Sequence, residues 1–294
     1  MHYNSPIVRP QTDANDLFIE LTVGCTHNSC TFCNFYDGYP FRVADWKQIE
    51  EDLQEAAAVY PHTTKVWATG GNPFALSVDN LKRFADLTKE YLPEARIGTY
   101  ARVNDLYHKS AEEIHILHEA GYDNIVLGIE SADDDVLSHV KKGYTAEDIL
   151  RECKKLEEAG MPYRIIYLGG LAGAGNGEES ARRTAAVLNQ LHPYYMFLTT
   201  VAILPGTKLH QEMLDGTFKE ETELERLKEF RRLIQDMKNP IGVFSATSTD
   251  VLAFTAHFPE DKDKVLKKFD KAISTFSAED EAYFNARRHA MRSV

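Results

Sequence analysis

The segment Val23-Gly-Cys-Thr-His-Asn-Ser-Cys-Thr-Phe-Cys-Asn-Phe-Tyr36 holds three of the four cysteines of the chain within nine residues. It continues a predicted strand at Leu17–Val23 and has no helical stripe of apolar residues, so its thiols can converge from an irregular loop. Cysteines spaced in this way differ from the framework of a small disulfide-linked secreted domain. The segment therefore indicates a metal site with Cys25, Cys30 and Cys33 as ligands.

The number of local thiolates matters for the kind of cluster that this loop could hold. Three thiolates leave one iron of a four-iron cluster without a protein ligand, and that iron can bind a substrate or a cofactor. Two alternatives stay open, the first being structural zinc with His27 as the fourth ligand. The second is the two-iron cluster of a plant-type ferredoxin, with Cys153 as the distant fourth ligand. Cys153, however, shares one face of a predicted helix with Ile149 and Leu156, which favours a buried thiol.

Outside this loop, short apolar runs alternate with amphipathic helical stretches, the pattern of repeated βα units with a parallel sheet. Strands are predicted at Leu17–Val23, Lys65–Ala68, Arg96–Ala101, Asn124–Gly128, Tyr163–Leu168 and Tyr195–Ile203. Helices are predicted at Ala44–Tyr60, Val78–Tyr91, Ala111–Ala120, Ala146–Ala159 and Glu178–Leu191. About six units joined by right-handed crossovers curl into a barrel, so we expect an α/β fold with a partial (β/α)6 TIM-like barrel.

The rhythm of the sequence changes after Thr207. Helices are predicted at Lys208–Leu214, Glu220–Met237, Lys262–Ser274 and Ala278–Met291, with an irregular stretch at Asn239–Pro259. No linker rich in Gly, Ser or Pro divides this tail from the barrel. We therefore expect a core of residues 1–207 and a C-terminal helical extension of residues 208–294 packed on the barrel.

Charge and hydropathy restrict the partners of the chain. The formal net charge is -12, which disfavours a nucleic-acid partner because a phosphate backbone would be repelled. The start of the chain lacks a basic region followed by an apolar run, and no window reaches the roughly 18 continuous apolar residues of a membrane span. We expect a soluble, cytoplasmic protein with no membrane partner.

Further motifs stand at the ends of the predicted strands. They are Ala68-Thr-Gly-Gly-Asn-Pro73, Tyr100-Ala-Arg-Val103, Gly128-Ile-Glu-Ser131, Val140-Lys-Lys-Gly-Tyr-Thr145, Leu168-Gly-Gly-Leu-Ala-Gly173 and Leu204-Pro-Gly-Thr207. Together with the cysteine loop they resemble the radical S-adenosylmethionine (SAM) superfamily. More narrowly they resemble the branch of oxygen-independent coproporphyrinogen oxidase-like proteins and proteins like the catalytic subunit of Elongator. The resemblance covers about Leu17 to Thr207, so residues 1–207 would be the radical SAM core.

The resemblance implies a [4Fe-4S] cluster on Cys25, Cys30 and Cys33, with SAM on the open iron. It also implies a set of SAM contacts: Phe32 beside the adenine, Gly70, Gly71 and Asn72 at the amino group, Arg102 at the carboxylate, Glu130 and Ser131 at the ammonium or ribose, Lys142 as a basic residue with Lys141 as the alternative, and Gly170 and Leu204 along the adenine.

Two positions depart from the family pattern. Four residues, Thr26 to Ser29, separate the first two cysteines where most of the superfamily has three. Asn72 stands where many relatives carry an acid, which would leave the ammonium of SAM to backbone groups and Glu130. A loop can absorb one extra residue and still present three thiols, so the implied cluster stands.

The resemblance implies an oxygen-sensitive enzyme that cleaves SAM reductively to a 5′-deoxyadenosyl radical, which abstracts hydrogen from a small-molecule substrate. The electron would come from an external donor such as flavodoxin or ferredoxin, and no protein acid or base is required. One alternative is an iron–sulfur electron-transfer or structural metal-binding protein without SAM chemistry. Another is an RNA-modifying radical SAM enzyme, which the acidic balance and the lack of a basic tract disfavour.

The substrate has few candidate contacts in the sequence. The irregular stretch Asn239–Pro259 offers Ser245, Thr247, Ser248 and His257. A surface loop whose hydroxyls cap turns is the other interpretation of this stretch.

Overall fold

A computed structural model describes residues 1–292 of the chain, which form two compact units. The first unit comprises Met1–Asn28, Phe35–Gly128 and Arg151–Arg164; the second comprises Ser29–Asn34, Ile129–Leu150 and the chain from Ile165 onward. The three-cysteine loop is thereby divided, because Cys25 belongs to the first unit whereas Cys30 and Cys33 belong to the second.

The first unit is built on a parallel sheet. Its strands, in spatial order, are β1 (Leu17–Glu20), β4 (Lys65–Thr69), β5 (Arg96–Ala101) and β6 (Tyr122–Glu130), whose last two residues, Ile129 and Glu130, belong to the second unit. Most residues of these strands are buried and none is exposed, as expected for strands covered on both faces. Parallel strands end at the same edge of a sheet, so the loops that follow β4 and β5 are neighbours.

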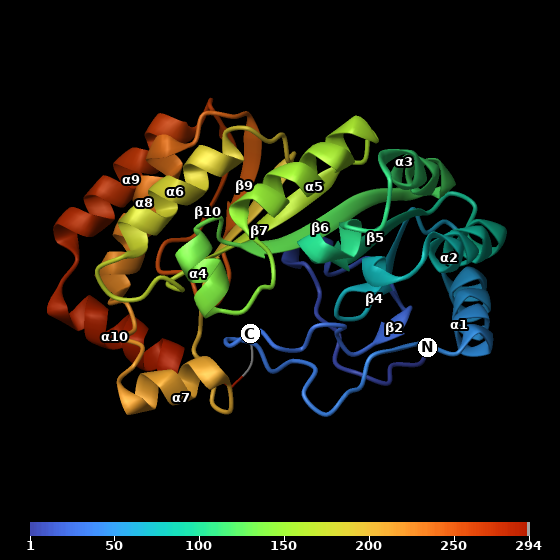
Figure 1. Cartoon of the computed structure of the whole chain (residues 1–294), viewed down its shortest axis with the longest axis horizontal. Coiled ribbons are helices and arrows are strands. Elements are labelled where there is room, and N and C mark those ends of the chain that lie inside the picture. Colours follow the sequence, from blue (N-terminus) through green and yellow to red (C-terminus); the bar gives the residue numbers. More distant parts are fainter. Residues whose placement is uncertain (293–294) are drawn as a thin grey trace. The chain divides into compact units, whose positions relative to one another are not determined.

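The helices of the first unit are α1 (Trp46–Val59), α2 (Val78–Tyr91) and α3 (Ala111–Ala120), joined by part of α5 (Ala146–Glu158). The first three lie side by side in the part of the chain coloured blue to teal (Figure 1). Local signals set their ends: the carboxylate of Asp45 caps α1, the hydroxyl of Ser77 caps α2, and Ser110 caps α3. Short 3-10 turns occur at η1 (Gln11–Asp13), η2 (Pro73–Ala75) and η3 (Val103–Leu106).

The predicted strand at Leu17–Val23 is broken at Leu21. Its last two residues form β2 (Thr22–Val23), which pairs antiparallel with β3 (Arg42–Val43) in a separate two-stranded sheet. The cysteine loop therefore starts at Gly24 from a hairpin rather than directly from the main sheet.

The second unit contains β7 (Tyr163–Gly169), β8 (Tyr195–Thr200), β9 (Ile241–Ser245) and β10 (Phe254–Phe258) in that spatial order. Strand β9 runs parallel to β8, and β10 runs antiparallel to β9. The prediction of an irregular stretch at Asn239–Pro259 was wrong, because both β9 and β10 fall within it. Burial alternates along β10, with Phe254, Ala256 and Phe258 inside and the residues between them exposed, which is the two-residue period of a strand.

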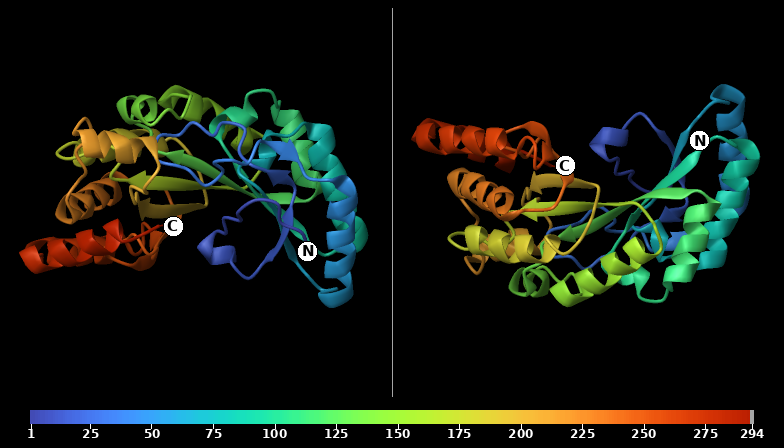
Figure 2. Two further views of the ribbon diagram at one scale, coloured as in Figure 1. Left: turned by 90° about the horizontal axis from the view of Figure 1, so that it is seen from below. Right: turned by 90° about the horizontal axis from the view of Figure 1, so that it is seen from above.

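The helices of the second unit are α4 (Asp134–His139), α6 (Gly177–Leu188), α7 (Lys208–Asp215), α8 (Glu223–Asp236), α9 (Lys262–Thr275) and α10 (Ala278–His289). Helix α6 packs on α8 and α8 packs on α9, as two further views show (Figure 2). Helix α4 was not predicted, because so short a segment has too few residues to reveal a period. The four predicted helices after Thr207 are present with shifted ends.

A buried ion pair joins the C-terminal helices to the end of β8. Arg288 of α10 donates from Nε and Nη2 to the two carboxylate oxygens of Glu223 of α8, each over 2.7 Å. Its Nη1 donates to the carbonyl of Val201 over 2.9 Å. Arg288 is 4% exposed, so α10 is anchored inside the unit. None of the helices within residues 1–292 is both long and apolar enough to cross a membrane.

Candidate cluster and cofactor site

In the first unit, the glycine pair after β4 lies against the start of the cysteine loop. The backbone N–H of Gly71 donates to the carbonyl oxygen of Gly24 over 3.0 Å. A Cβ atom on Gly71 would stand 2.7 Å from Cβ of Cys25, and one on Gly70 would stand 2.0 Å from the hydroxyl of Thr22. Only glycine permits this approach, since real Cβ atoms do not come so close to other atoms.

Asn72, directly after the glycine pair, is fully buried and connects two segments of the first unit. Its Oδ1 accepts the backbone N–H of Thr26 over 3.0 Å, and its Nδ2 donates to the hydroxyl of Thr26 over 2.6 Å. The same Nδ2 donates to both carboxylate oxygens of Asp105, over 2.9 and 3.0 Å. The prediction that Asn72 contacts SAM stays a prediction; its side chain joins the residue after Cys25 to Asp105.

Asp105 belongs to the turn η3, which follows the end of β5. Its carboxylate accepts the backbone N–H of Arg102 over 2.7 Å, and its carbonyl accepts from Nζ of Lys109 over 3.0 Å. Burial raises the pKa of the Asp105 carboxyl, against the lowering effect of the hydrogen bonds from the N–H of Arg102 and the side chain of Asn72. Burial also disfavours the charged form of Lys109, and therefore lowers the pKa of this ammonium group. Arg102, a predicted contact of the SAM carboxylate, therefore has its backbone held by Asp105.

In the second unit, Cys30 and Cys33 are brought together by a turn. The N–H of Cys33 donates to the carbonyl of Cys30 over 3.2 Å, and both residues are half-buried, reduced thiols. Two backbone hydrogen bonds of Thr31 hold the turn in place. Its N–H donates to the carbonyl oxygen of Val140 over 3.2 Å, and its carbonyl oxygen accepts the N–H of Leu209 over 2.7 Å. These bonds hold the turn to the end of α4 and the start of α7.

Phe32, within the same turn, packs against the buried cluster that contains Val140 and Leu171. Nζ of Lys142 lies 5.9 Å from the centre of the Phe32 ring and donates to Oε1 of Glu130 over 3.2 Å. Lys142 and Glu130 are both buried, and Glu130 ends β6 with a positive φ of 63°. Lys141 is exposed, so Lys142 is the lysine that meets Glu130.

The other predicted contacts of the second unit have partners of their own. The Ser131 hydroxyl accepts the N–H of Asp133 over 3.1 Å and lies 3.3 Å from the hydroxyl of Thr184. The N–H of Gly170 donates to Oε2 of Glu229 over 2.8 Å. Leu204 is buried, and its carbonyl accepts the hydroxyl of Thr207 over 2.8 Å.

Sequence reasoning missed the residues that hold the predicted ones in place. Asp105 and Thr26 fix Asn72, and Glu229 fixes Gly170. Asp105 carried one usable signal, because an acid three residues after Arg102 matches the spacing of a capping residue. Nothing in the sequence pointed to Glu229, which lies 59 positions from Gly170.

The candidate substrate contacts are spread over the β9–β10 hairpin. Ser245 is buried in β9, and His257 is exposed on β10. The hydroxyl of Thr247 lies 2.8 Å from that of Thr199 and 2.7 Å from that of Thr249. The carbonyl of Ser248 accepts from Arg287. A role for these four residues in substrate binding stays a prediction.

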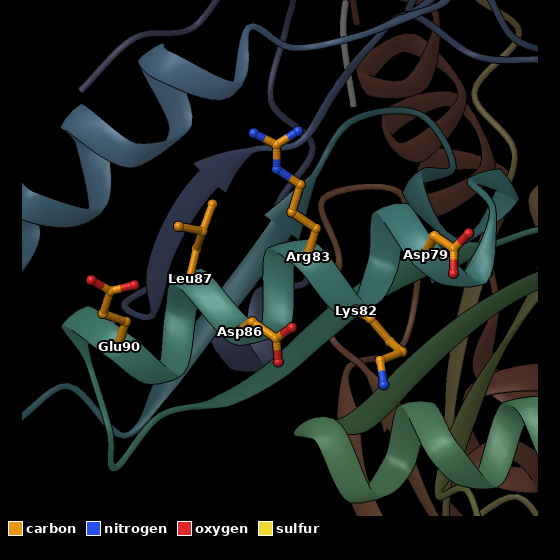
Figure 3. A pocket seen from close by; sticks show the side chains of 6 residues that line it. All are labelled: Asp79, Lys82, Arg83, Asp86, Leu87 and Glu90. Carbon is orange, nitrogen blue, oxygen red and sulfur yellow. The ribbon is translucent and has the colours of Figure 1, made fainter.

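Two hollows of the surface lie apart from the predicted contacts. One of about 310 Å³ lies along α2 and is lined by charged side chains around Leu87 (Figure 3). The other, of about 280 Å³, lies in the second unit between α4 and α6. No predicted site residue lines either hollow.

Within residues 1–292, no three His, Cys, Asp or Glu side chains converge on a point that could bind a single metal ion. In a four-iron cluster each thiolate binds a different iron, so the sulfurs need not converge in that way. The chemistry of the residues fits such a cluster, because thiolates are the usual ligands of iron–sulfur clusters and Cys25, Cys30 and Cys33 are half-buried and form no disulfide.

Comparison with known proteins supports the sequence resemblance. Residues 19–186, more than half of the chain, match the model of the Radical SAM superfamily. The heme chaperone HemW of Bacillus subtilis (strain 168) is 27% identical over 102 residues, which are 34% of this chain and 27% of that protein.

Two solved structures extend the comparison. Coproporphyrinogen III oxidase (HemN) from Escherichia coli, a radical SAM enzyme, is 18% identical with a TM-score of 0.56, over 75% of this chain and 51% of that one. Elp3 of the archaeon Methanocaldococcus infernus is 16% identical with a TM-score of 0.52, over 87% of this chain and 63% of that one. The chain thus spans less than two thirds of each of these three relatives. The predicted fold class, α/β with a partial TIM-like barrel, is confirmed, and the similar proteins include both kinds named in the predicted branch.

Proposed function

Because this chain belongs to the radical SAM superfamily, and so is an enzyme whose cofactors are SAM and a [4Fe-4S] cluster, we propose that it cleaves SAM reductively. We further propose that the resulting radical abstracts hydrogen from a small-molecule substrate. The observation that supports this most is the contact of Gly71 with the Cys25 segment. It brings the backbone proposed to bind the amino group of SAM next to the first proposed cluster ligand.

Cys25, Cys30 and Cys33 are the proposed ligands, and the fourth iron is left for SAM. With SAM bound there, one electron breaks a carbon–sulfur bond to give methionine and a 5′-deoxyadenosyl radical, which becomes 5′-deoxyadenosine when it takes hydrogen from the substrate. The electron comes from an external donor such as flavodoxin or ferredoxin.

The other residues of the chain bind and orient SAM in this proposal. Glu130 is buried beside Lys142, and a carboxylate paired with an ammonium can still accept hydrogen bonds from the amino group or the ribose hydroxyls of SAM. Phe32 offers an apolar ring face to the adenine. The remaining proposed contacts are Gly70, Gly71, Asn72, Arg102, Ser131, Gly170 and Leu204.

The substrate class follows from charge. A net charge of -12 opposes binding of a phosphate backbone, so we propose a small molecule rather than a nucleic acid.

We propose a core of residues 1–207 and an extension of residues 208–294 packed on it. No disulfide joins the four cysteines, which suits the reducing conditions of a cytoplasm.

The test is anaerobic reconstitution of the protein with iron and sulfide, followed by assay of 5′-deoxyadenosine formed from SAM and dithionite. Wild type is compared with Cys30→Ala and with Cys153→Ala, a matched control because Cys153 is a thiol buried within α5. We expect wild type and Cys153→Ala to cleave SAM and Cys30→Ala not to. Loss of cleavage in both variants, or no cleavage by wild type at full cluster loading, would refute the assignment.

Electron paramagnetic resonance gives a second readout that does not depend on turnover. The signal of the reduced cluster is expected to change when SAM is added to wild type. An unchanged signal at saturating SAM means that SAM does not bind iron, and the protein would then only transfer electrons.

A further inference from the structure

A hydrogen-bonded chain of three side chains, Thr26–Asn72–Asp105, lies within the first unit. Asn72 is 0% exposed and Asp105 is 9% exposed. Both polar atoms of the Asn72 side chain are engaged, with Thr26 on one side and Asp105 on the other. Thr26 is the residue next to Cys25, so the chain ends one residue from a proposed cluster ligand.

The orientation of the Asn72 amide is dictated by Asp105. The carboxyl group accepts the N–H of Arg102 on one oxygen, and the NH2 group of Asn72 faces both of its oxygens, at 2.9 and 3.0 Å. The amide oxygen then has only one direction left, toward the N–H of Thr26 at 3.0 Å. With the opposite orientation, the amide oxygen would face the carboxylate of Asp105 and the NH2 group would face the N–H of Thr26. Both of these buried contacts would be repulsive.

Asp105 is itself held in place by the turn η3. Its carboxylate accepts the N–H of Arg102 over 2.7 Å, and its carbonyl accepts from the buried ammonium of Lys109. A single carboxylate thus connects the backbone of Arg102, at the end of β5, through Asn72 to the segment of Cys25.

We propose that Asp105 is a positioning residue: acting through Asn72, it fixes the Cys25 segment in the geometry that the cluster requires. The proposal rests on the proposed function, since it presumes that Cys25 binds iron. It assigns to the Asn72 side chain the role of connecting Asp105 to Thr26, and leaves the contact with SAM at this place to backbone groups.

A reciprocal exchange of the two side chains tests this proposal. In Asn72→Asp, the introduced carboxylate faces the carboxylate of Asp105. In Asp105→Asn, the oxygen of the introduced amide must still accept the N–H of Arg102, so its NH2 group turns toward the NH2 group of Asn72. In the double variant the 2.9 Å contact between the two side chains is restored with its direction reversed, while the N–H groups of Thr26 and Arg102 still donate. The amide introduced at position 105 donates to the carboxylate introduced at position 72. That carboxylate also accepts from the N–H of Thr26 and from its hydroxyl, which can rotate to donate.

The measurements are made on reconstituted full-length protein under anaerobic conditions. They are the rate of iron loss to a chelator and the paramagnetic resonance spectrum of the reduced cluster. We expect each single variant to lose iron about tenfold faster than wild type and to show altered g-values, because a repulsive buried contact displaces the Cys25 segment. The double variant should recover both properties.

Asp52→Asn is the matched control. Asp52 is a buried carboxylate of the same unit, held by His2 and remote in the hydrogen-bond network from the cysteine loop. Its substitution should lower stability while the iron loss and the spectrum stay as in wild type. A similar spectral change in Asp52→Asn would show that general destabilisation, rather than positioning, is the cause.

Each outcome decides the matter. Single variants with the spectrum and iron loss of wild type, or a double variant no better than the singles, overturn the proposal while SAM cleavage by wild type leaves the proposed function intact. If wild type fails to load a cluster, both proposals fall together. If a single variant does not fold, the double variant still decides, because recovery of the wild-type spectrum is expected only from complementary contacts.

Discussion

The backbone N–H of Gly71 donates to the carbonyl oxygen of Gly24 over 3.0 Å, and this bond ties the glycine pair after β4 to the residue before Cys25. A methyl group on Gly71 would stand 2.6 Å from that same oxygen and 2.7 Å from Cβ of Cys25. Both neighbours belong to the loop itself rather than to a flexible side chain. The loop must therefore move if position 71 is enlarged.

Gly71→Ala is expected to reduce the iron retained after reconstitution to less than about half, because the displaced Cys25 no longer meets the cluster with the other thiols. Iron and sulfide analysis after gel filtration measures the effect. Gly216→Ala is the control: Gly216 ends α7 with a φ of 81° and has nothing within 4 Å of an added Cβ. That variant should lose about 1 kcal/mol of stability and keep its iron. Full iron retention in Gly71→Ala would contradict the close packing described.

Lys142→Met is expected to weaken SAM binding at least about tenfold, because it leaves the buried carboxylate of Glu130 without its cation. Lys141→Met changes the neighbouring exposed lysine and should leave affinity within about twofold. Equilibrium binding of SAM to the reconstituted protein compares the two. A larger loss in Lys141→Met would assign the basic contact to the other lysine.

Arg288→Met is expected to destabilise the protein by about 3 kcal/mol, because the buried carboxylate of Glu223 loses both of its hydrogen bonds from Arg288 and is left with the guanidinium of Arg226, 4.0 Å away. Urea unfolding of the protein without cluster measures this change. Arg287→Met, in the adjacent exposed position, should change the free energy of unfolding by less than about 1 kcal/mol. Equal losses of unfolding free energy in the two variants would mean that the ion pair of Arg288 and Glu223 adds nothing to the stability that helix α10 itself provides.

Asp250 provides a prediction about pH. Burial raises the pKa of its carboxyl from the usual 3.8 to about 6, against the lowering effect of hydrogen bonds from Thr247. The folded state then holds this proton more tightly than the unfolded state, so the contribution to stability is full below pH 3.8 and is lost as the pH rises through about 6.

Asp250→Asn should remove this dependence, because an amide does not titrate. Between about pH 4 and 6.5 the wild type should lose about 2–3 kcal/mol of unfolding free energy relative to the variant. Urea unfolding of both proteins at several pH values gives the difference directly. A difference that stays constant across this range would mean that Asp250 titrates as it does in the unfolded chain.

Long elements with a clear period could be predicted from the sequence. The stripe of Ile49, Leu53, Ala56, Ala57 and Tyr60 predicted α1. The first three are buried together with Asp52, whereas Ala57 is half-buried and Tyr60 is exposed just after the helix ends. The hairpin of β9 and β10 could not be recognised, because its strands are short and are flanked by Pro240, Pro259 and many hydroxyl residues that are typical of turns. Pairing with β8 and burial beneath α9 stabilise these strands, and neither is a local property.

Within the candidate site the same division holds. Local chemistry marked Cys25, Cys30, Cys33 and the glycine pair, because thiolates at close spacing and glycines at a strand end are informative wherever they occur. The choice of Lys142 over Lys141 required the structure, since adjacent lysines are equivalent in sequence and only the fold buries one of them beside Glu130.

The sequence by itself determined the family, the βα repeat and the type of cofactor, since each of these depends on residue types and spacings within short segments that follow one another along the chain. Only the tertiary structure decided which groups hold the site in place: Asp105 on Asn72, Glu229 on Gly170 and Arg288 on the end of β8. These partners lie 33, 59 and 87 positions apart in the chain. A hydrogen bond depends on distance and direction in space, and no periodicity of the sequence records contacts over such separations.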